Sequence, residues 1–576
     1  MINVTINGTK IEVQPNTTIL EVARKLNIDI PTLCHLDLDN IKYVNDGARC
    51  RVCVVEVLGK NNLVTACNTI ITDGMEIKTH TPRSISARRA NVELLLSNHP
   101  KDCLTCPKNG QCELQELSSK LGISKIDYEG KMQDHELDIS NNAIVRNKNK
   151  CILCGRCETM CNVIQTVGVY SNINRGFNTA MTTAFDDPLA KSPCTYCGQC
   201  VSVCPTAALT EVTNRKEVWA ALNHQDKFVI VQTAPAVRVA LGEMFGFDAG
   251  TNVTGKMISS LRKLGFDKVY DTNFAADLTV VEETYELLTR LNAGGPLPML
   301  TSCCPAWVNF IEYHYPNLLS IPSTCKSPHE MFGAIAKTYL AEKLGIAKEK
   351  IVVVSIMPCL AKKYEANREE LKNEYPNVDY VITTRELSRM IMESGIDFNS
   401  LEDEEFDNIM GKSSGAAAIF GTTGGVLEAV LRSANFALTN STELKIEFKE
   451  IRDMKSIREA EVTVGGQNLK VAITHGLGNA RILLDKIQNK EAKYDVIEIM
   501  ACPGGCIGGG GQPYYHKTDE NLLNKRRSAL FKIDTNSEVR ISLKNPEIKE
   551  LYQTFLGKIG GEKAHELLHT TYKNKK

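Results

Sequence analysis

The sequence has 576 residues, of which 43% are hydrophobic and 23% are charged. At roughly 150 residues per domain, this length predicts about four domains and excludes a small module held together by disulfides. The 67 basic and 68 acidic residues give a net charge of -1, whereas a nucleic-acid-binding domain normally carries a basic excess. We therefore expect no nucleic-acid partner.

The unusual feature of the composition is its 21 cysteines. The N-terminus does not have the pattern of a signal peptide, and no apolar run reaches the roughly 18 residues that a membrane span needs. We therefore expect a cytoplasmic protein with no membrane span. Cytosolic thiols stay reduced, and an odd number of cysteines cannot pair completely within one chain. The cysteines are therefore expected to bind metal.

Residues 1–80 are expected to form a β-grasp [2Fe-2S] domain that resembles a ferredoxin. Apolar residues alternate on both sides of Asn7-Gly8, which is a strong hairpin turn. Thr18 and Glu21 have the spacing of a capping box and predict a helix that begins there. A [2Fe-2S] cluster, or alternatively a zinc ion, would be held by four cysteines: Cys34, Cys50, Cys53 and Cys67.

Residues 81–125 contain a second, smaller cysteine group. Its three closely spaced cysteines, Cys103, Cys106 and Cys112, lack a fourth ligand. His99 lies close enough upstream to supply an imidazole, although an isolated histidine of this kind is more often a surface residue. From the spacing alone, both interpretations of His99 remain open.

Residues 126–212 carry an internal repeat that is typical of bacterial ferredoxins with two [4Fe-4S] clusters. The fourth cysteine of each run in that pattern binds the other cluster. The expected ligands of the first cluster are Cys151, Cys154, Cys157 and Cys204. Those of the second cluster are Cys194, Cys197, Cys200 and Cys161. Zinc is a poor alternative for eight thiolates in this repeated spacing.

Residues 213–576 are expected to form a large α/β domain. Apolar runs at 228–231, 297–300, 351–354 and 496–499 predict buried strands of parallel sheet. Cysteines follow three of these runs, at the position where open α/β sheets bind ligands: Cys303, Cys304, Cys359 and Cys502. Cys506 comes next and leads into glycines at 508–511, which indicate either a flexible loop or backbone passing close to a bulky cofactor.

Three segments, at 301–307 (TSCCPAW), 357–363 (MPCLAKK) and 500–506 (MACPGGC), resemble the motifs of [FeFe]-hydrogenase catalytic domains. With the cysteine groups that precede them, they make the whole chain similar to long clostridial-type enzymes. The resemblance implies one [2Fe-2S] cluster, three accessory [4Fe-4S] clusters and an H-cluster, which is a [4Fe-4S] cube joined to a diiron unit with CO, cyanide and azadithiolate. It implies that Cys304, Cys359, Cys502 and Cys506 bind the cube, with Cys506 as the bridge to the diiron unit. It also makes His99 the fourth ligand of the cluster bound by Cys103, Cys106 and Cys112.

The resemblance also implies the reaction 2H⁺ + 2e⁻ ⇌ H₂ and a proton route to the H-cluster. Cys303 is the spare thiol of its motif, and a thiol with an ordinary pKa near 8.5 can donate and recover a proton. The alternative is a small buried hydrophobic residue. The implied route continues through Glu283, Ser323 and Glu286 to Arg290. Its two glutamates and arginine have the spacing of one helix face, which could instead be a solvated charged surface.

Other residues are expected around the diiron unit. The resemblance implies that Lys362 and Met357 contact the diiron unit, and that Lys362 donates a hydrogen bond to a cyanide. It places Pro235 and Ser327 in the walls of the pocket around this unit. Ala236 stands where many members of the family have Ser, Cys325 where many have Ala, and His329 where many have Gln. These departures are more similar to the catalytic subunits of multimeric, NAD(P)-linked hydrogenases.

Alternatives to this interpretation remain. The first 115 residues also resemble an electron-transfer subunit of a respiratory NADH dehydrogenase, and a hydrogen sensor or assembly factor would share the catalytic fold. The three motifs and Cys303 argue against both. The sequence has no strand followed by Gly-x-Gly-x-x-Gly and no P-loop, so NAD(P)H would be handled by a flavin-bearing partner subunit. A stand-alone enzyme that uses ferredoxin directly is the alternative.

Overall fold

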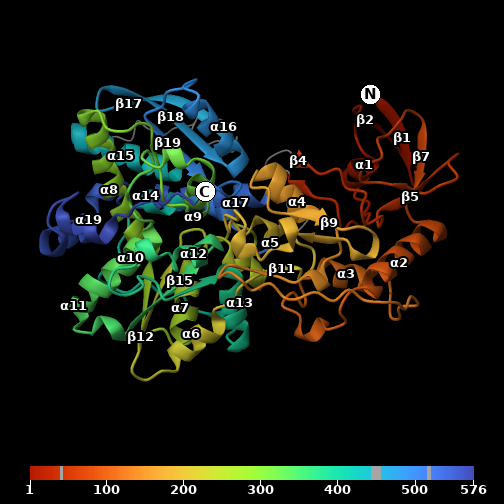
Figure 1. Cartoon of the computed structure of the whole chain (residues 1–576), viewed down its shortest axis with the longest axis horizontal. Coiled ribbons are helices and arrows are strands. Elements are labelled where there is room, and N and C mark those ends of the chain that lie inside the picture. The colour runs from red at the N-terminus through yellow and green to blue at the C-terminus, as the bar shows by residue number, and fades with distance from the viewer. Residues whose placement is uncertain (39–42, 443–455, 515–520, 576) are drawn as a thin grey trace.

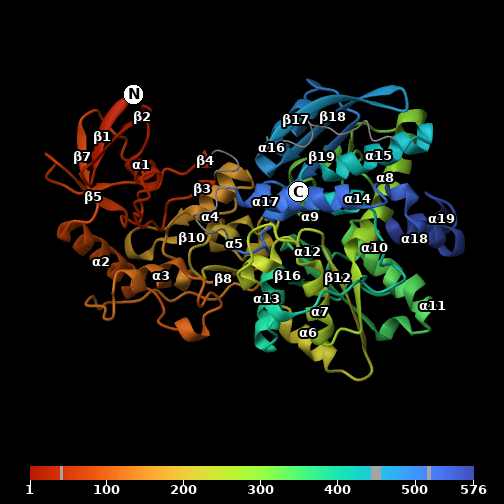
Figure 2. The same cartoon turned by 180° about the vertical axis from the view of Figure 1, so that it is seen from behind.

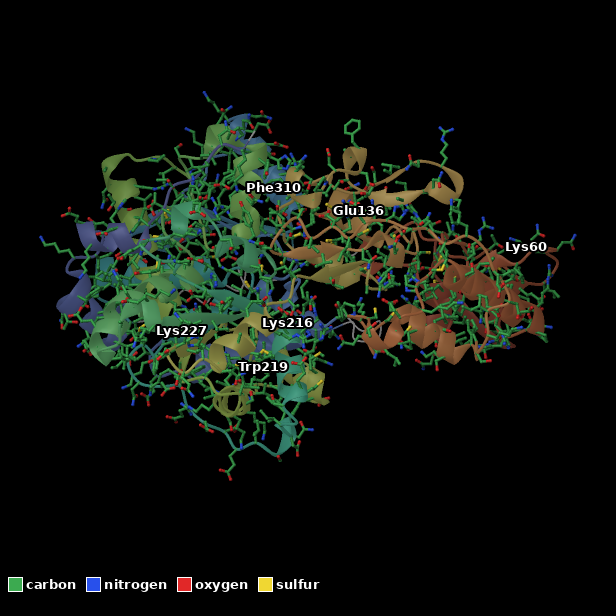
Figure 3. The ribbon with its side chains drawn as sticks, turned by 60° about the horizontal axis from the view of Figure 1, so that its bottom comes forward. Lys60, Glu136, Lys216, Trp219, Lys227 and Phe310 are labelled. Carbon is green, nitrogen blue, oxygen red and sulfur yellow. The ribbon has the colours of Figure 1, made fainter. Side chains whose placement is uncertain are left out.

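The computed structural model describes residues 1–38, 43–442, 456–514 and 521–575. The molecule is elongated, with the N-terminal units at one end and a larger lobe at the other (Figure 1, Figure 2). In the view with side chains, Lys60 lies toward the narrow end, whereas Lys227 and Phe310 lie in the large lobe (Figure 3). The first cysteine groups thus lie in the narrow part, and the three hydrogenase-like motifs lie in the lobe.

The first unit is a five-stranded sheet in the order β2-β1-β7-β5-β6, and helix α1 shares its core. The predicted hairpin is confirmed, with Asn7 and Gly8 at positive φ. The predicted capping box is also confirmed, because Thr18 and Glu21 each accept a hydrogen bond from the other's backbone N–H. The elements are β1 (Ile2–Ile6), β2 (Thr9–Val13), α1 (Ile19–Lys25), β3 (Asp37–Leu38), β4 (Tyr43–Val44), β5 (Val54–Val57), β6 (Val64–Thr65) and β7 (Met75–Lys78).

Two helices and a compact unit with two short antiparallel ribbons follow. In each cysteine run, a glycine between the second and third cysteine, Gly155 or Gly198, has a positive φ and starts a short helix. Only glycine adopts this backbone conformation without strain. The elements are α2 (Pro82–Ser97), α3 (Glu113–Lys120), β8 (Ile144–Arg146), α4 (Arg156–Glu158), β9 (Ser171–Ile173), β10 (Ala180–Thr182), α5 (Gln199–Val203) and β11 (Leu209–Glu211).

The large lobe contains two four-stranded sheets. The first, in the order β13-β12-β15-β16, is entirely parallel. The second, in the order β14-β19-β18-β17, is parallel except for the β17–β18 hairpin. The strands are β12 (Phe228–Thr233), β13 (Lys268–Asp271), β14 (Met299–Leu300), β15 (Ile351–Met357), β16 (Tyr380–Thr383), β17 (Ile457–Val464), β18 (Gln467–His475) and β19 (Val496–Met500).

All four apolar runs form parallel strands, so this part of the prediction is confirmed. The run at 297–300 contributes only Met299 and Leu300 to β14, because Pro298 has no backbone N–H to pair. The β17–β18 hairpin was not predicted. Its signal was present in the sequence, since Gly465 and Gly466 interrupt two alternating segments, and both have positive φ in the structure.

Helices cover the two sheets, and one core joins the lobe to the ferredoxin-like unit. Trp307, Phe310 and Leu360 of the lobe share this core with Val201 and Leu209. Among the described residues, no helix combines the length and apolar character needed to cross a membrane. The helices of the lobe are α6 (Arg215–Leu222), α7 (Thr254–Lys263), α8 (Thr272–Ala293), α9 (Pro305–His314), α10 (Pro328–Ile335), α11 (Ala341–Leu344), α12 (Ala361–Glu365), α13 (Thr384–Glu393), α14 (Gly415–Ala418), α15 (Gly425–Thr439), α16 (Leu477–Gln488), α17 (Leu522–Asn536), α18 (Pro546–Leu551) and α19 (Glu562–Leu568).

Candidate metal centres and catalytic cavity

A cavity with about 730 Å³ of empty space lies where strands of both sheets in the lobe end. The loops after β12, β14, β15 and β19 all contribute to its wall, as the ligand-site rule for parallel sheets predicts. Four of the predicted metal ligands line it together: Cys304, Cys359, Cys502 and Cys506. Cys303, Met357, Lys362 and Pro235 also line it. The structure therefore brings eight predicted site residues to one cavity.

Two of the residues predicted around the diiron unit lie outside the lining of this cavity. Ala236 is fully buried, and its carbonyl accepts a hydrogen bond of 2.9 Å from Nε2 of Gln512. Ser327 is the N-terminal capping residue of α10, and its buried hydroxyl has no partner among the described side chains. Ser327 lines a neighbouring cavity of about 300 Å³ instead, together with Cys325 and Glu365.

Lys362 is held at the cavity by two contacts. Its Nζ donates to the carbonyl oxygen of Cys303 at 3.2 Å and to Oε2 of Glu365 at 2.7 Å. Burial opposes its charge, but the Glu365 carboxylate raises the pKa of Lys362 above its ordinary value. The ammonium thus stays charged beside the cavity.

No role was predicted for His329 or for Glu365 from the sequence. His329 lines the catalytic cavity, and Nδ1 of its ring lies 3.0 Å from the same Glu365 oxygen that binds Lys362. Nε2 of His329 is buried without a partner in the described part of the chain. The i, i+3 spacing of Lys362 and Glu365 on α12 was the signal that could have identified Glu365.

The predicted acidic residues lie in the interior of the lobe on α8, not on a solvated helix face. Glu283 is fully buried, and Glu286 accepts hydrogen bonds from Ser323 Oγ at 2.8 Å and from Arg290 at 2.5 Å. Arg290 also donates to the carbonyl oxygens of Ile321 and of the following proline. The structure thus joins Ser323, Glu286 and Arg290 in one network.

Glu283 interacts electrostatically with Glu286 of this network and with Cys303. Burial, and then repulsion by Glu286, raises the pKa of Glu283 to about 8. Burial, and then the charge of Glu283, raises the pKa of the Cys303 thiol as well. Both groups therefore hold their protons near neutral pH. The ordinary thiol pKa assumed from the sequence does not apply to this surrounding.

The four cysteines of the first unit converge. Sγ of Cys34 interacts with the sulfur atoms of both Cys50 and Cys67, and Cys53 interacts with Cys67. Backbone N–H groups point toward these sulfurs, since Ala48 N lies 3.3 Å from Cys67 Sγ. N–H donors of this kind stabilise the thiolate form that a metal cluster needs.

His99 is buried and is not a surface residue, and its Nδ1 has no partner among the described residues. Burial, and then the nearby Lys150, lowers the pKa of His99 to about 4, so the imidazole is neutral. Lys150 also interacts with the thiol of Cys106. Cys103 is exposed, and Cys112 caps the start of α3. The group thus offers a neutral imidazole and three thiols within one short segment.

The repeat is arranged around two separate cavities. Cys151, Cys154, Cys157 and Cys204 line one of about 470 Å³. Cys161, Cys194, Cys197 and Cys200 line the other, of about 300 Å³. In each case, three cysteines come from one run and the fourth comes from the other run, which is the grouping expected from the spacing.

The glycines at 508–511 pack closely against other segments of the chain as well as against the catalytic cavity. Gly509 lines the catalytic cavity. A Cβ atom on Gly510 would lie 2.6 Å from the carbonyl carbon of Gly198, and one on Gly511 would lie 2.8 Å from the Thr383 side chain. The sequence indicated either a flexible loop or backbone close to a cofactor, and neither interpretation included this close approach to the ferredoxin-like unit.

Comparison with known proteins gives five family matches. Residues 227–510 match the iron only hydrogenase large subunit, C-terminal domain, and residues 519–575 match the iron hydrogenase small subunit. Residues 1–82 match a 2Fe-2S iron-sulfur cluster binding domain, and residues 150–208 match a 4Fe-4S dicluster domain. Residues 88–127 match the NADH-ubiquinone oxidoreductase-G iron-sulfur binding region.

The chain is 54% identical to the NADP-reducing hydrogenase subunit HndD of Solidesulfovibrio fructosivorans, over 99% of both chains. The chain belongs to the [FeFe]-hydrogenase family. It is also 40% identical to iron hydrogenase 1 of Clostridium pasteurianum, over the full length of both. A solved structure of apo [FeFe]-hydrogenase HydA1 from Chlamydomonas reinhardtii has 44% identity and a TM-score of 0.56, and the match covers 62% of this chain and 98% of that one.

This [FeFe]-hydrogenase is therefore an enzyme that acts on H₂ and carries iron–sulfur clusters and an H-cluster, as the resemblance implied. The catalytic cavity fits such a group. Four thiols around one large cavity are the donor set of a [4Fe-4S] cube. The remaining wall is mostly apolar, with Met357, Phe420 and Met500, so it keeps the site dry.

Proposed function

We propose that this chain is the catalytic subunit of a multimeric hydrogenase that interconverts protons and H₂ and exchanges electrons with ferredoxin and with NAD(P) through flavin-bearing partner subunits. The observation that carries the proposal is the 54% identity, over 99% of both chains, to a relative named as an NADP-reducing hydrogenase subunit. The presence of all three catalytic motifs around one cavity supports turnover rather than sensing.

We propose one [2Fe-2S] cluster, three accessory [4Fe-4S] clusters and the H-cluster as its cofactors. Cys304, Cys359, Cys502 and Cys506 would hold the H-cluster, which supplies the redox-active irons where 2H⁺ + 2e⁻ ⇌ H₂ takes place. The accessory ligands would be His99 and fifteen cysteines: Cys34, Cys50, Cys53, Cys67, Cys103, Cys106, Cys112, Cys151, Cys154, Cys157, Cys161, Cys194, Cys197, Cys200 and Cys204. Ferredoxin-like and β-grasp units at the narrow end then offer a route for electrons toward the lobe (Figure 1).

The residues around the cavity would perform three tasks. The charged Lys362 would bind an anionic ligand of the diiron unit, since it is buried and fixed by Glu365. Cys303 would donate and recover protons at the cavity, and Glu283 would exchange protons with it. Ser323 and Glu286 would carry the proton onward to Arg290 at the end of the route.

The contact between the ferredoxin-like unit and the lobe would deliver electrons. The thiol of Cys197 interacts electrostatically with those of Cys304 and Cys502. The second cluster of the repeat would therefore be the electron donor closest to the H-cluster among the proposed centres. We further propose a cytoplasmic location, in which these clusters stay reduced.

The test is anaerobic expression of the full chain with its partner subunits and the H-cluster maturation proteins. We expect infrared bands from iron-bound diatomic ligands, H₂ formation from reduced ferredoxin, and NADPH-linked activity only when the partner subunits are present. NADPH-linked activity of the isolated chain would refute the multimeric proposal. Matured protein with the infrared bands but without exchange between D₂ and water would refute the enzymatic one.

A further inference from the structure

Two cysteine loops from different parts of the chain meet backbone to backbone. Gly198 lies between Cys197 and Cys200, and Gly510 lies four residues after Cys506. A Cβ atom on Gly510 would come within 2.6 Å of the Gly198 backbone. Beside this contact, Nε2 of Gln199 donates to the carbonyl oxygen of Gly508 at 2.9 Å. The loop of the second cluster of the repeat therefore touches the loop of the proposed bridging ligand directly.

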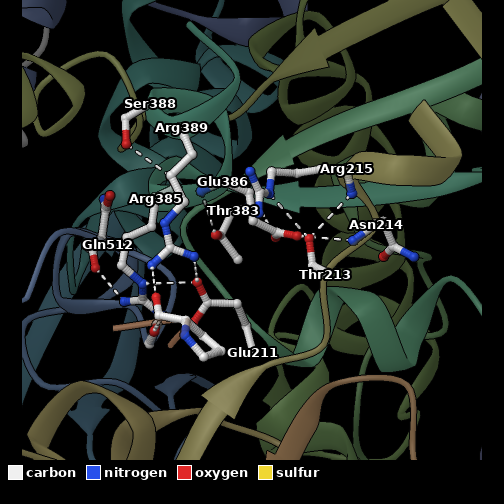
Figure 4. A network of polar contacts seen from close by, with 12 residues as sticks. Glu211, Thr213, Asn214, Arg215, Thr383, Arg385, Glu386, Ser388, Arg389 and Gln512 are labelled. Carbon is white, nitrogen blue, oxygen red and sulfur yellow. Dashed lines mark hydrogen bonds and ion pairs between the residues drawn. The ribbon is translucent and has the colours of Figure 1, made fainter. Parts of the chain in front are cut away.

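A single buried arginine on α13 holds both sides of this contact (Figure 4). Arg385 has no exposed surface, and it donates to the carbonyl oxygens of Gly510 at 2.8 Å and of Gln512 at 2.5 Å. Its guanidinium also donates to Oε2 of Glu211 at 2.8 Å. Glu211 is the last residue of β11, in the ferredoxin-like unit. The side chain thus links this unit to the loop after Cys506.

The His99 segment is tied to the same place. The guanidinium of Arg385 lies 4.4 Å from the centre of the Tyr514 ring, and Nζ of Lys108 lies 4.0 Å from it. Lys108 is buried and donates to the carbonyl oxygen of Cys204. One helical turn after Arg385, Arg389 donates to the carbonyl oxygen of Pro107 at 2.8 Å. Three cysteine-bearing segments therefore meet around Arg385.

The charges of Arg385 and Glu211 are costly to bury, and apolar side chains could fill the same space. Buried ion pairs contribute little net stability, and apolar residues of similar size often replace them without loss. Burial alone would raise the pKa of Glu211, but Arg385 lowers it to about 2, so the pair remains charged. An arginine fork fixes the two carbonyls and the carboxylate in one geometry, which an apolar side chain cannot do.

We propose that Arg385 and Glu211 are positioning residues for electron transfer from the second cluster of the repeat to the H-cluster. One electron crosses the Gly198–Gly510 contact at a time, so the accessory cluster is oxidised as the H-cluster is reduced. Because electron tunnelling weakens steeply with distance, a small separation of the two loops slows this step. The inference rests on the proposed function, since it assigns clusters to both loops.

The test compares two activities of the full, matured chain. H₂ formation from reduced ferredoxin needs electrons to cross the contact, whereas exchange between D₂ and water takes place at the H-cluster and needs no external electrons. For Arg385→Met and Glu211→Gln, we expect ferredoxin-driven H₂ formation to fall roughly tenfold to a hundredfold, as for a displaced reacting geometry. We expect D₂ exchange and the infrared bands of the H-cluster to stay as in the wild type.

Arg432→Met is the matched control. Arg432 is also fully buried and pairs with Asp534 at 2.8 Å, but both residues lie within the lobe and neither contacts the ferredoxin-like unit through a described polar contact. We expect it to change both activities in the same proportion, if at all. Equal losses of both activities in Arg385→Met and Glu211→Gln would overturn the inference, as would unchanged ferredoxin-driven activity.

Two readouts separate failure of this inference from failure of the proposed function. If Arg385→Met does not mature, which the loss of its infrared bands would show, the Glu211→Gln variant decides, because it keeps the size of the side chain. After rapid mixing with reduced ferredoxin, we expect the accessory clusters of both variants to be reduced as fast as in the wild type, and the H-cluster more slowly. A wild type without D₂ exchange would refute the proposed function itself.

Discussion

At the scale of single residues, the Cys303 thiol stands between the catalytic cavity and Glu283. Its raised pKa keeps the thiol protonated near neutral pH, so that a proton is held at the wall of the cavity. For Cys303→Ala, we expect H₂ formation to fall by a factor of roughly a hundred to ten thousand, the usual contribution of a positioned acid–base group. Cys303→Asp should retain part of the activity because it restores a titratable group. Hydrogen production and infrared spectra of the matured variants measure both effects.

Intact infrared bands in Cys303→Ala serve as the control, because they show that the H-cluster is still present. Full activity of this variant would contradict the proton-transfer role and leave Cys303 as a small buried residue of the cavity wall.

Glu283 makes the reaction depend on pH. Its pKa of about 8 is raised by burial and by Glu286, so the folded protein favours the protonated carboxyl. Its stabilising contribution is complete below the ordinary glutamate pKa and is lost as the pH rises toward 8. For the same reason we expect H₂ formation to decline above about pH 8, where the carboxyl no longer donates. A pH profile of wild type and Glu283→Gln measures this decline.

In Glu283→Gln, we expect low activity without that alkaline decline, because an amide neither titrates nor passes a proton. Glu282→Gln is the neighbouring control on α8, since Glu282 is bound by Tyr552 and His569 instead. If the alkaline decline persists in Glu283→Gln, a different titrating group causes it.

His99 gives a third test at this scale. The buried imidazole is neutral, with its pKa lowered to about 4 by burial and by Lys150, and its Nδ1 lacks a described partner. A histidine must be neutral to bind a metal, because the coordinating nitrogen needs its free electron pair. We expect His99→Ala to alter the magnetic resonance signal of one cluster, and His99→Cys to restore a four-ligand site with a shifted potential. An unchanged spectrum of His99→Ala would make the residue a bystander.

At the scale of elements, helix α13 positions Arg385, and its own start is fixed by a second capping box. Thr383 accepts from Glu386 N at 3.1 Å, and Glu386 accepts from Thr383 N at 2.8 Å. Replacing Thr383 by Val keeps the shape and removes the hydroxyl. We expect a loss of about 1 kcal/mol in stability, the usual cost of a helix cap, or more because the site is buried.

A shift of the urea midpoint of the Thr383→Val variant measures that loss. Thr535→Val is the control, because Thr535 lies exposed near the end of α17 and its hydroxyl donates to the helix carbonyl of Phe531. Equal midpoints for the two variants would mean that the cap does not stabilise α13.

The elements that the sequence predicted well are those determined by neighbouring residues. The Asn7-Gly8 hairpin and the Thr18–Glu21 cap need only local rules, and the valine-rich run of β15 indicates a strand buried on both faces. The division of the lobe into two sheets, and the α13 clamp, depend on contacts between distant segments. Arg385 and Glu211 are 174 residues apart, so no local pattern relates them.

At the scale of the whole molecule, the motifs predicted which residues line the cavity. They did not predict the buried contacts that hold these lining residues in place. Cysteine spacing determines the ligand groups because the chain must fold around each cluster. The network of Lys362, Glu365 and His329 joins α12 to α10, and the shared core joins the repeat to the lobe. These long-range contacts decide pKa values and loop positions, and a single sequence carries no direct signal for them.

The narrow end of the molecule gives the last prediction. The main core of the β-grasp unit is composed of residues from 1–80, and Leu33 and Val52 share a second cluster with Val92 and Ile152. None of the clusters that contain residues of this unit includes a described residue of the lobe, so the unit can be removed without opening the lobe. A chain of residues 81–576 should therefore lose the [2Fe-2S] signal yet keep D₂ exchange and the H-cluster infrared bands. If electrons from the partner subunits arrive through this unit, NADPH-linked H₂ formation should be lost as well.

Cys67→Ser in the full chain is the matched control, because it disrupts the same cluster and leaves the sheet in place. NADPH-linked rates that survive both changes would mean that electrons reach the catalytic lobe by another centre.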